Sequence, residues 1–193
     1  RRLALVFPGQ GAQFVGMGAE LYQESPEARE VFERADETLS MDLSRLCFEG
    51  PAEVLDDTAN TQPAIYTVTY ALWRAFVARF RTDLPRIGCV AGHSLGEFSA
   101  LAVAGAVRFE DGLRLVRCRG EAMRDSGAAV PGGMGVILGL ADDAVAAVVA
   151  EVSSATGNGT SGVWIANLNC PGQVVIAGER EALDRALALA RAR

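Results

Sequence analysis

IGCVAGHSLGEFSALAVAG, residues 87–105, joins two apolar segments through a short stretch that holds one serine between glycines. The first segment, residues 87–91, predicts a buried strand, and apolar residues at helical spacing predict a helix over residues 95–105. The joining stretch is a G-x-S-x-G sequence with Ser94 at its centre. Such a sequence indicates a nucleophilic serine where a strand turns sharply into a helix, because that turn exposes the serine hydroxyl. The sequence therefore predicts a strand–elbow–helix with Ser94 as a candidate nucleophile.

The helix that follows Ser94 is expected to offer free N–H groups and a positive dipole end to an oxyanion. The alternative is a chance pentapeptide in which Ser94 only caps the helix. A serine nucleophile also needs a base, and His93 is the only histidine of the chain. Adjacent side chains at an elbow diverge, so we expect His93 to be a packed neighbour. The base is then expected outside these 193 residues.

Strands and helices alternate through the first two thirds of the chain. Leu3 to Phe7 predicts a buried strand that Pro8-Gly9 ends, and residues 26–39 and 63–80 have helical patterns. With the strand over residues 87–91, this alternation predicts an α/β domain with a parallel sheet. We assign residues 1–130 to this larger subdomain.

Residues 131–193 are assigned to a smaller subdomain with the order β-α-β-β-α. A ferredoxin-like unit has the order β-α-β-β-α-β, so this one would lack its last strand. Together with a start at Arg1 and an end at Arg193, this order indicates a piece of a longer chain. The pattern predicts strands over 134–140, 163–168 and 173–177, helices over 142–152 and from about 179, and a loop over 153–162.

Composition excludes several classes of protein. The chain has 193 residues and a net charge of −6, which argues against nucleic acid because phosphate binding needs a concentrated basic surface. No apolar run is long enough for a membrane span. The four cysteines lack metal-ligand spacing and there is one histidine, so no metal site is expected. A reduced, cytoplasmic protein is the simplest interpretation.

Arg119 stands apart within the helix predicted over residues 110–125. At about 100° per residue, the polar face holds Arg114, Arg117, Glu121 and Arg124. Arg119 falls on nearly the opposite side, among Leu115, Val116 and Met123. An arginine there is either a buried structural ion pair or a ligand for an anion, and its planar fork suits a carboxylate. The pattern leaves both possibilities open.

The loop Phe7-Pro8-Gly9-Gln10-Gly11 follows the first strand. Open α/β sheets place their sites at the carboxyl ends of strands, so this loop and the Ser94 elbow are expected at the same edge. Its backbone could supply a second oxyanion N–H, or it could be an ordinary tight turn. It lacks the Lys and Ser/Thr of a phosphate-binding Walker motif.

Four stretches together resemble the malonyl-CoA:acyl-carrier-protein transacylase family, which includes fatty-acid enzymes and acyltransferase domains of polyketide synthases. They are FPGQGAQ (7–13), GHSLGE (92–97), LVRCRG (115–120) and NCPGQVVIAGE (169–179). The resemblance spans essentially the whole chain and implies an α/β-hydrolase-like subdomain carrying a ferredoxin-like one. TQPA, residues 61–64, resembles the malonyl-type form of the family.

The resemblance also implies roles for five residues. Ser94 matches the nucleophile, Gln10 and Leu95 match the residues whose backbone N–H groups form the oxyanion hole, and Arg119 matches the ligand of the malonyl carboxylate. Asn169 matches a stretch beside the acyl cleft. The implied reaction moves a malonyl group from malonyl-CoA to the phosphopantetheine thiol of an acyl carrier protein through acyl-Ser94, with no metal or redox cofactor.

The family's catalytic histidine is expected beyond Arg193, so these residues alone are expected to be inactive. Two other functions stay open: an acyl hydrolase of the same fold, which would not need Arg119, and a non-catalytic fragment that binds carrier protein. A discrete enzyme and a polyketide synthase domain are also both compatible with the sequence.

Overall fold

We describe a computed structural model of residues 2–83, 86–129, 131–155 and 162–193. Contacts within the chain divide it into two units, Arg1–Arg124 and Asp125–Arg193, so the boundary falls inside helix α7 (Phe109–Ala129). The assignment of residues 1–130 and 131–193 to an α/β-hydrolase-like and a ferredoxin-like subdomain stays a prediction. Among the described residues, no helix combines the length and apolar character that a bilayer crossing requires.

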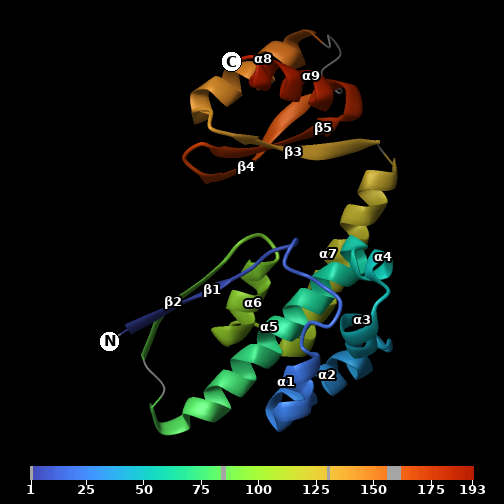
Figure 1. The fold of residues 1–193 in the computed structure, drawn as a ribbon, viewed down its shortest axis with the longest axis vertical. Coiled ribbons are helices and arrows are strands. Elements are labelled where there is room, and N and C mark those ends of the chain that lie inside the picture. Colours follow the sequence, from blue (N-terminus) through green and yellow to red (C-terminus); the bar gives the residue numbers. More distant parts are fainter. Residues whose placement is uncertain (1, 84–85, 130, 156–161) are drawn as a thin grey trace. The chain divides into compact units, whose positions relative to one another are not determined.

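The first unit contains the predicted parallel strand pair. β1 (Arg2–Phe7) and β2 (Arg86–Gly92) pair in parallel and end together, with Phe7 opposite Gly92. Figure 1 shows the two strands side by side, with α6 (Gly96–Val103) against them. The parallel sheet predicted from the alternating pattern is confirmed, and its carboxyl edge carries both the glycine-rich loop and the Ser94 elbow.

Helices make up most of this unit. α2 (Pro26–Leu39) has the predicted bounds, because Pro26 suits a first helical position and the Ser25 hydroxyl accepts from the Ala28 N–H at 3.2 Å. Its neighbours along the chain are α1 (Ala19–Glu24), α3 (Leu43–Glu49) and α4 (Ala52–Leu55). The periodicity did not predict these three, because each is too short to repeat an apolar pattern.

Helix α5 (Thr58–Phe80) begins five residues before the predicted start at Pro63. Its true N-cap is Asp57, whose carboxylate accepts from the Ala59 N–H at 2.8 Å. Pro63 lies inside the helix and has no N–H for the Ala59 carbonyl one turn earlier. Arg117 Nη1 donates to that carbonyl instead, at 3.1 Å, so a neighbouring helix satisfies the acceptor that the proline leaves.

The core of the first unit lies between α2, α5 and α7. Tyr66 is fully buried there, stacks on Phe109 with 5.5 Å between ring centroids, and donates to the Phe109 carbonyl at 3.1 Å. Burial raises the pKa of Tyr66 above its usual value. Gly112 makes room for this ring, because a β carbon there would lie 2.1 Å from the Tyr66 hydroxyl.

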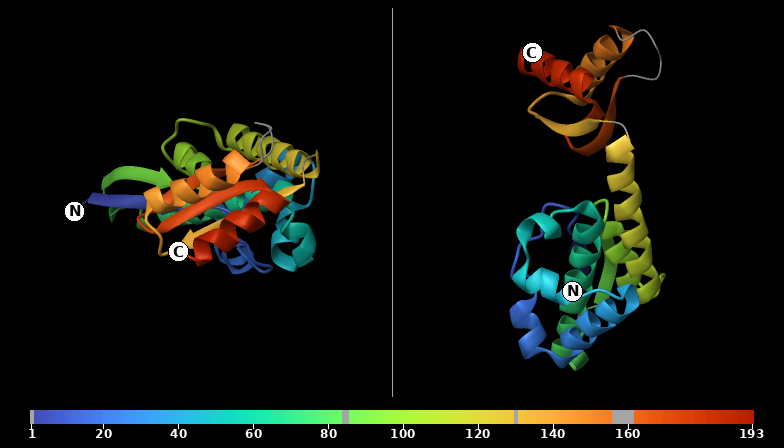
Figure 2. Two further views of the ribbon diagram at one scale, coloured as in Figure 1. Left: turned by 90° about the horizontal axis from the view of Figure 1, so that it is seen from above. Right: turned by 90° about the vertical axis from the view of Figure 1, so that its right-hand side faces the viewer.

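The second unit confirms the predicted order β-α-β-β-α. β3 (Gly132–Leu138), β5 (Gln173–Glu179) and β4 (Val163–Cys170) form an antiparallel sheet in that spatial order. Helices α8 (Asp142–Ala155) and α9 (Arg180–Arg191) lie on one face of it (Figure 2). The predicted loop over 153–162 is partly wrong, because α8 continues to Ala155; residues 156–161 lie outside the described residues.

The first strand of the second unit differs from its predicted bounds. The strand expected over residues 134–140 begins at Gly132 and ends at Leu138, because Gly139 turns the chain with a φ of 88°. Buried side chains pack between the sheet and the helices, while the other face of the sheet exposes Met134, Val136, Leu138, Trp164 and Leu168.

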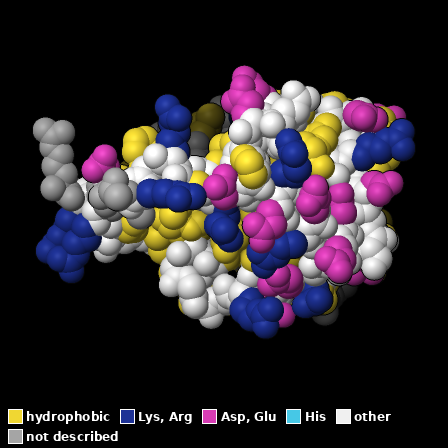
Figure 3. Space-filling view, turned by 90° about the horizontal axis from the view of Figure 1, so that it is seen from below, with side chains coloured by type: hydrophobic (Ala, Val, Ile, Leu, Met, Phe, Trp, Pro, Cys, Tyr) yellow, Lys and Arg dark blue, Asp and Glu magenta, His cyan; other side chains and the backbone are white. Residues whose placement is uncertain are grey.

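On the face of the molecule drawn in Figure 3, basic and acidic side chains are interspersed.

Candidate active site

The backbone around Ser94 forms the predicted elbow. Ser94 has a φ of 53°, a left-handed conformation that is uncommon for a residue with a side chain. A β carbon at Gly92 would lie 2.0 Å from the Gly96 carbonyl carbon, and one at Gly96 would lie 2.3 Å from the Phe7 carbonyl oxygen. Both glycines are therefore required by close backbone packing. The helix N-cap is Leu95, so the alternative that Ser94 is merely the cap is wrong.

The N–H groups at the start of α6 are not all free, contrary to expectation. Those of Gly96, Glu97 and Phe98 donate to the carbonyls of His93, Ser94 and Leu95 at 2.9, 3.1 and 3.0 Å. The Leu95 N–H has no acceptor among the described residues, although the Leu95 side chain is fully buried. The Leu95 N–H, which the family resemblance selects for the oxyanion hole, is thus not used by another group of the described residues.

The Gln10 loop lies at the same edge of the sheet as the elbow. The His93 N–H donates to the Phe7 carbonyl at 3.2 Å, and a β carbon at Gly9 would lie 2.8 Å from the His93 carbonyl oxygen. The Gln10 N–H likewise has no acceptor in the described part of the chain, whereas its side-chain Oε1 accepts from the Thr58 hydroxyl at 3.1 Å. Loop and elbow are packed together as predicted.

His93 lies against this loop. A β carbon at Gly9 would be 3.1 Å from His93 Nδ1, so the imidazole ring borders the loop backbone. The side-chain partner of Ser94 is a different residue, Arg119. This arrangement supports the expectation that His93 shapes the site.

Arg119 reaches from α7 to the elbow. Its Nη2 donates to Ser94 Oγ at 2.8 Å, and its Nη1 donates to Gln62 Oε1 at 2.6 Å. Across the described ranges, no Asp or Glu lies within ion-pair distance of Arg119. The structural ion pair that the sequence left open is therefore absent from the described part of the chain. An uncompensated guanidinium beside a serine hydroxyl favours an anion ligand.

The surroundings of Arg119 correct the predicted helix faces. Leu115 and Met123 are 50% and 43% exposed, so Arg119 lies beside the buried stripe of α7 and not within it. Arg117, predicted on the polar face, is turned toward α5 and donates to Asn60 Oδ1 at 2.7 Å while pairing with Glu121 at 2.6 Å. Helical periodicity placed these residues around the axis but did not identify which neighbour each faces.

Two residues of the site were given no role in the sequence analysis. Gln62 is fully buried, and its Nε2 donates to Thr58 Oγ1 at 3.0 Å. The signal that could have found Gln62 is an amide side chain within an apolar helix, inside the TQPA stretch that marks the family form. Thr58 lies in the first turn of α5, which the prediction left out of the helix.

Asn169 belongs to the second unit, in β4, where it is exposed and its Nδ2 donates to Gln173 Oε1 at 3.2 Å. Its assignment to the acyl cleft stays a prediction.

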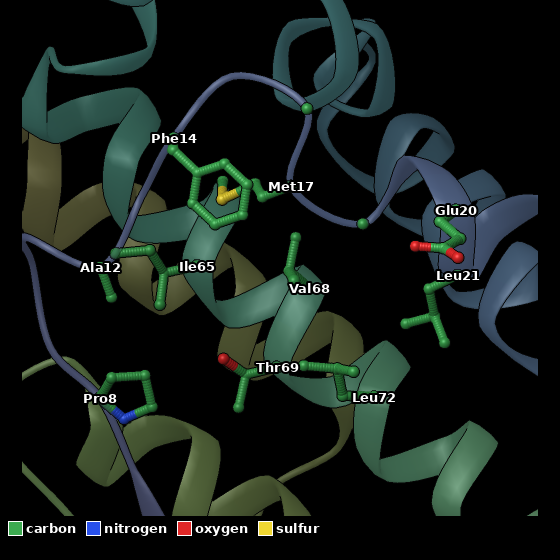
Figure 4. A pocket seen from close by; sticks show the side chains of 12 residues that line it. Pro8, Ala12, Phe14, Met17, Glu20, Leu21, Ile65, Val68, Thr69 and Leu72 are labelled. Atoms are coloured by element: carbon green, nitrogen blue, oxygen red, sulfur yellow. The ribbon is translucent and has the colours of Figure 1, made fainter.

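A hollow of about 440 Å³ lies beside the Gln10 loop, between residues 8–21 and α5. Figure 4 shows that its lining is mainly apolar, with Phe14 and Met17 on one side and Ile65 and Val68 on the other. Glu20 is the one charged residue among the described residues that line the hollow, and its carboxylate would repel an anion, so the hollow offers no cation for an acyl carboxylate.

Comparison with known proteins identifies the family of the chain. The profile of the acyl transferase domain matches residues 4–193. The chain belongs to this family. The chain is 45% identical over 190 residues to the malonyl CoA-acyl carrier protein transacylase of Bacillus subtilis (strain 168), a match that covers 98% of the chain and 57% of the relative.

Solved structures of the family have the same fold. The malonyl CoA-acyl carrier protein transacylase of Coxiella burnetii superposes with a TM-score of 0.89 at 42% identity, and the match covers 100% of this chain and 58% of that one. A malonyl-transacylase in complex with its type II polyketide synthase acyl-carrier protein superposes with a TM-score of 0.87 at 40% identity. This match covers 100% of the present chain and 60% of the transacylase. The chain thus spans about three fifths of the length of these relatives.

Proposed function

We propose that the protein to which this sequence belongs transfers a malonyl group from malonyl-CoA to the phosphopantetheine thiol of an acyl carrier protein. The observation that carries the proposal is the 2.8 Å contact between Arg119 Nη2 and Ser94 Oγ. One methylene separates the carboxylate of a malonyl thioester from its carbonyl carbon. When Ser94 attacks the carbonyl, the carboxylate therefore lies close to the Arg119 guanidinium.

In the first half of the reaction, Ser94 Oγ attacks the thioester carbonyl and loses its proton to a base. The developing oxyanion accepts hydrogen bonds from the Leu95 and Gln10 N–H groups, neither of which has an acceptor among the described residues. The C–S bond then breaks, CoA leaves as a thiol after taking a proton, and malonyl-Ser94 remains. In the second half the carrier thiol attacks this ester, and Ser94 regains its proton.

The base is proposed to come from outside these 193 residues. His93 is the only histidine, and its ring borders the Gly9 backbone. Since Arg119 donates to Ser94 Oγ, the hydroxyl oxygen acts as acceptor there and keeps its own hydrogen for a base on another side.

Two rival functions make different use of Arg119. A hydrolase for uncharged acyl groups would gain nothing from a cation beside Ser94, and a non-catalytic fragment would need neither the strained elbow nor the free donors. The relatives' names and the carrier-protein complex support transfer to a carrier protein.

The test uses the complete parent chain with malonyl-CoA and a phosphopantetheinylated acyl carrier protein. We expect malonyl-carrier protein by mass spectrometry, formed faster than free malonate and faster than acetyl-carrier protein from acetyl-CoA. Release of free malonate as the main product would identify a hydrolase, and no turnover of either thioester would refute the proposal.

A further inference from the structure

Gln62 is a fully buried amide that the mechanism above does not use. Both ends of its side chain have partners, since Oε1 accepts from Arg119 Nη1 and Nε2 donates to Thr58 Oγ1. Buried polar groups are costly unless they are paired, so these contacts fix the amide in one orientation. Gln62 is therefore a rigid connection between Arg119 and the first turn of α5.

Arg119 determines which atom donates in each of the hydrogen bonds that connect it through Gln62 to Thr58 and Gln10. A guanidinium only donates, so the Gln62 atom that faces it must be the oxygen, and the amide nitrogen must face Thr58. The Thr58 hydroxyl accepts from that nitrogen, which leaves its own hydrogen for Gln10 Oε1, 3.1 Å away. Each residue donates to the next in the order Arg119, Gln62, Thr58 and Gln10. The series therefore connects the arginine proposed to bind the carboxylate with the loop proposed to stabilise the oxyanion.

These contacts leave Arg119 able to bind a carboxylate. Each Nη carries two hydrogens, and each donates once within the protein, to Gln62 or to Ser94. One N–H on each Nη and the Nε–H remain for a ligand. Arginine has many rotamers, and a partner that holds one of them reduces the entropy lost when a carboxylate binds.

We propose that Gln62 is a positioning residue that sets the acyl-group preference of the enzyme, an inference that rests on the proposed function. Gln62 holds Arg119 Nη1, so that the rest of the guanidinium faces the carboxylate of an acyl group bound at Ser94. Gln62 itself does not touch the reacting atoms. Its loss weakens malonyl transfer, which needs an ordered Arg119, and leaves acetyl transfer, which does not.

The experiment compares Gln62→Met with the wild type in the complete parent chain. Methionine has a similar volume and no oxygen for Arg119. Because a hydrogen bond to a charged group is involved, we expect kcat/KM for malonyl-CoA to fall roughly tenfold or more, with kcat/KM for acetyl-CoA little changed. A residue that only supports the fold would lower both values together.

A double variant separates positioning from general damage. In an Arg119→Ala background there is no guanidinium to hold, so adding Gln62→Met should leave the malonyl-to-acetyl ratio where Arg119→Ala alone puts it. Thr58→Val removes the group that holds the far end of Gln62, at a partly exposed position. It should shift the ratio in the same direction by a smaller factor, and it keeps the test available should Gln62→Met not fold.

Thr67→Val is the matched control on the same helix. Thr67 is fully buried, and among the described residues its hydroxyl has no hydrogen-bond partner. Loss of the Thr67 hydroxyl should leave the malonyl-to-acetyl ratio of kcat/KM unchanged. A wild-type ratio in Gln62→Met, or an additive loss in the double variant, would overturn the positioning role while malonyl transfer by the wild type still stands. Failure of the wild type to transfer malonyl would instead refute the proposed function.

Discussion

Gly120 and Thr58 bring two helices into backbone contact: a β carbon at Gly120 would lie 2.6 Å from the Thr58 carbonyl oxygen. α7 and the first turn of α5 thus approach more closely than any side chain at Gly120 would allow. Arg119, the residue before, gains its reach to Gln62 and Ser94 from this approach. A glycine in the middle of a helix is unfavourable in itself, so its presence here serves the contact.

Replacing Gly120 with alanine should force the two helices apart. We expect a loss of roughly 1–3 kcal/mol in the free energy of unfolding, typical of overpacking, and a reduced preference for malonyl-CoA. Denaturant unfolding of the complete parent chain measures the first effect. Gly127→Ala is the control in the same helix, since nothing lies within 4 Å of its β-carbon position. Equal stability of Gly120→Ala and Gly127→Ala would contradict the close approach.

Ser94→Ala should abolish the covalent intermediate. After brief exposure to malonyl-CoA without carrier protein, intact-mass analysis of the complete parent chain should show one malonyl adduct on the wild type and none on Ser94→Ala. Ser99→Ala is the matched control, because Ser99 follows on α6 and its buried hydroxyl has no described partner. An adduct on Ser94→Ala would exclude this serine as the nucleophile.

Arg119→Ala should change the substrate preference and leave the fold intact. Loss of a charge-assisted contact costs about 1.5–3 kcal/mol, or roughly one to two decades in kcat/KM for malonyl-CoA. Transfer of acetyl groups should rise relative to malonyl. Arg114→Ala, an exposed arginine of the same helix that pairs with Asp111 at 3.2 Å, should behave like the wild type. The assignment of Arg119 fails if its alanine variant keeps the wild-type ratio.

Acid should destabilise the protein partly through Glu110. The hydrogen bond from Arg34 holds the pKa of this carboxyl below its usual value, and Arg34 also lies 5.6 Å from the Phe109 ring centroid. A lowered folded-state pKa contributes stability that is present above the unfolded-state pKa of about 4.3 and is lost as pH falls through the folded-state value.

Glu110→Gln tests this contribution. Its melting temperature should lie below that of the wild type at pH 7, and the difference should shrink between about pH 5 and pH 3 as the wild-type carboxyl takes up a proton. Glu49→Gln serves as control, since its pair with Arg45 is highly exposed and contributes little. A difference that stays constant down to pH 3 would contradict the pairing.

The sequence predicted those parts of the site that depend on local backbone geometry. The elbow could be predicted because a G-x-S-x-G sequence between a strand and a helix has few other conformations. The loop at Gln10 could be placed beside it because parallel strands end at one edge. The start of α5 was predicted wrongly because Pro63 resembles a first helical residue, while the real cap, Asp57, precedes a turn with little apolar pattern.

The contacts of Arg119 could not be predicted from helical periodicity. They depend on how closely α7 approaches α5, which is a property of the packed helices and is set at Gly120. The family resemblance gave Arg119 a ligand but gave Gln62 no role, because the hydrogen bond between them joins residues 57 positions apart. Short helices such as α3 were missed because they are held by packing, and their sequences hold too few turns to repeat.

Arg117 and Arg119 hold the first turns of α5 by different means. Arg117 donates to the Ala59 carbonyl that Pro63 leaves without an N–H, whereas Arg119 donates to the Gln62 side chain. Arg117 also donates to Asn60 Oδ1, but its bond to the Ala59 carbonyl is made to the backbone, whereas the contact of Arg119 depends entirely on the side chain at position 62. Over evolutionary time, substitutions near Gln62 could retune which acyl group is accepted while Arg117 keeps the helix in place, so that substrate range and fold can vary separately.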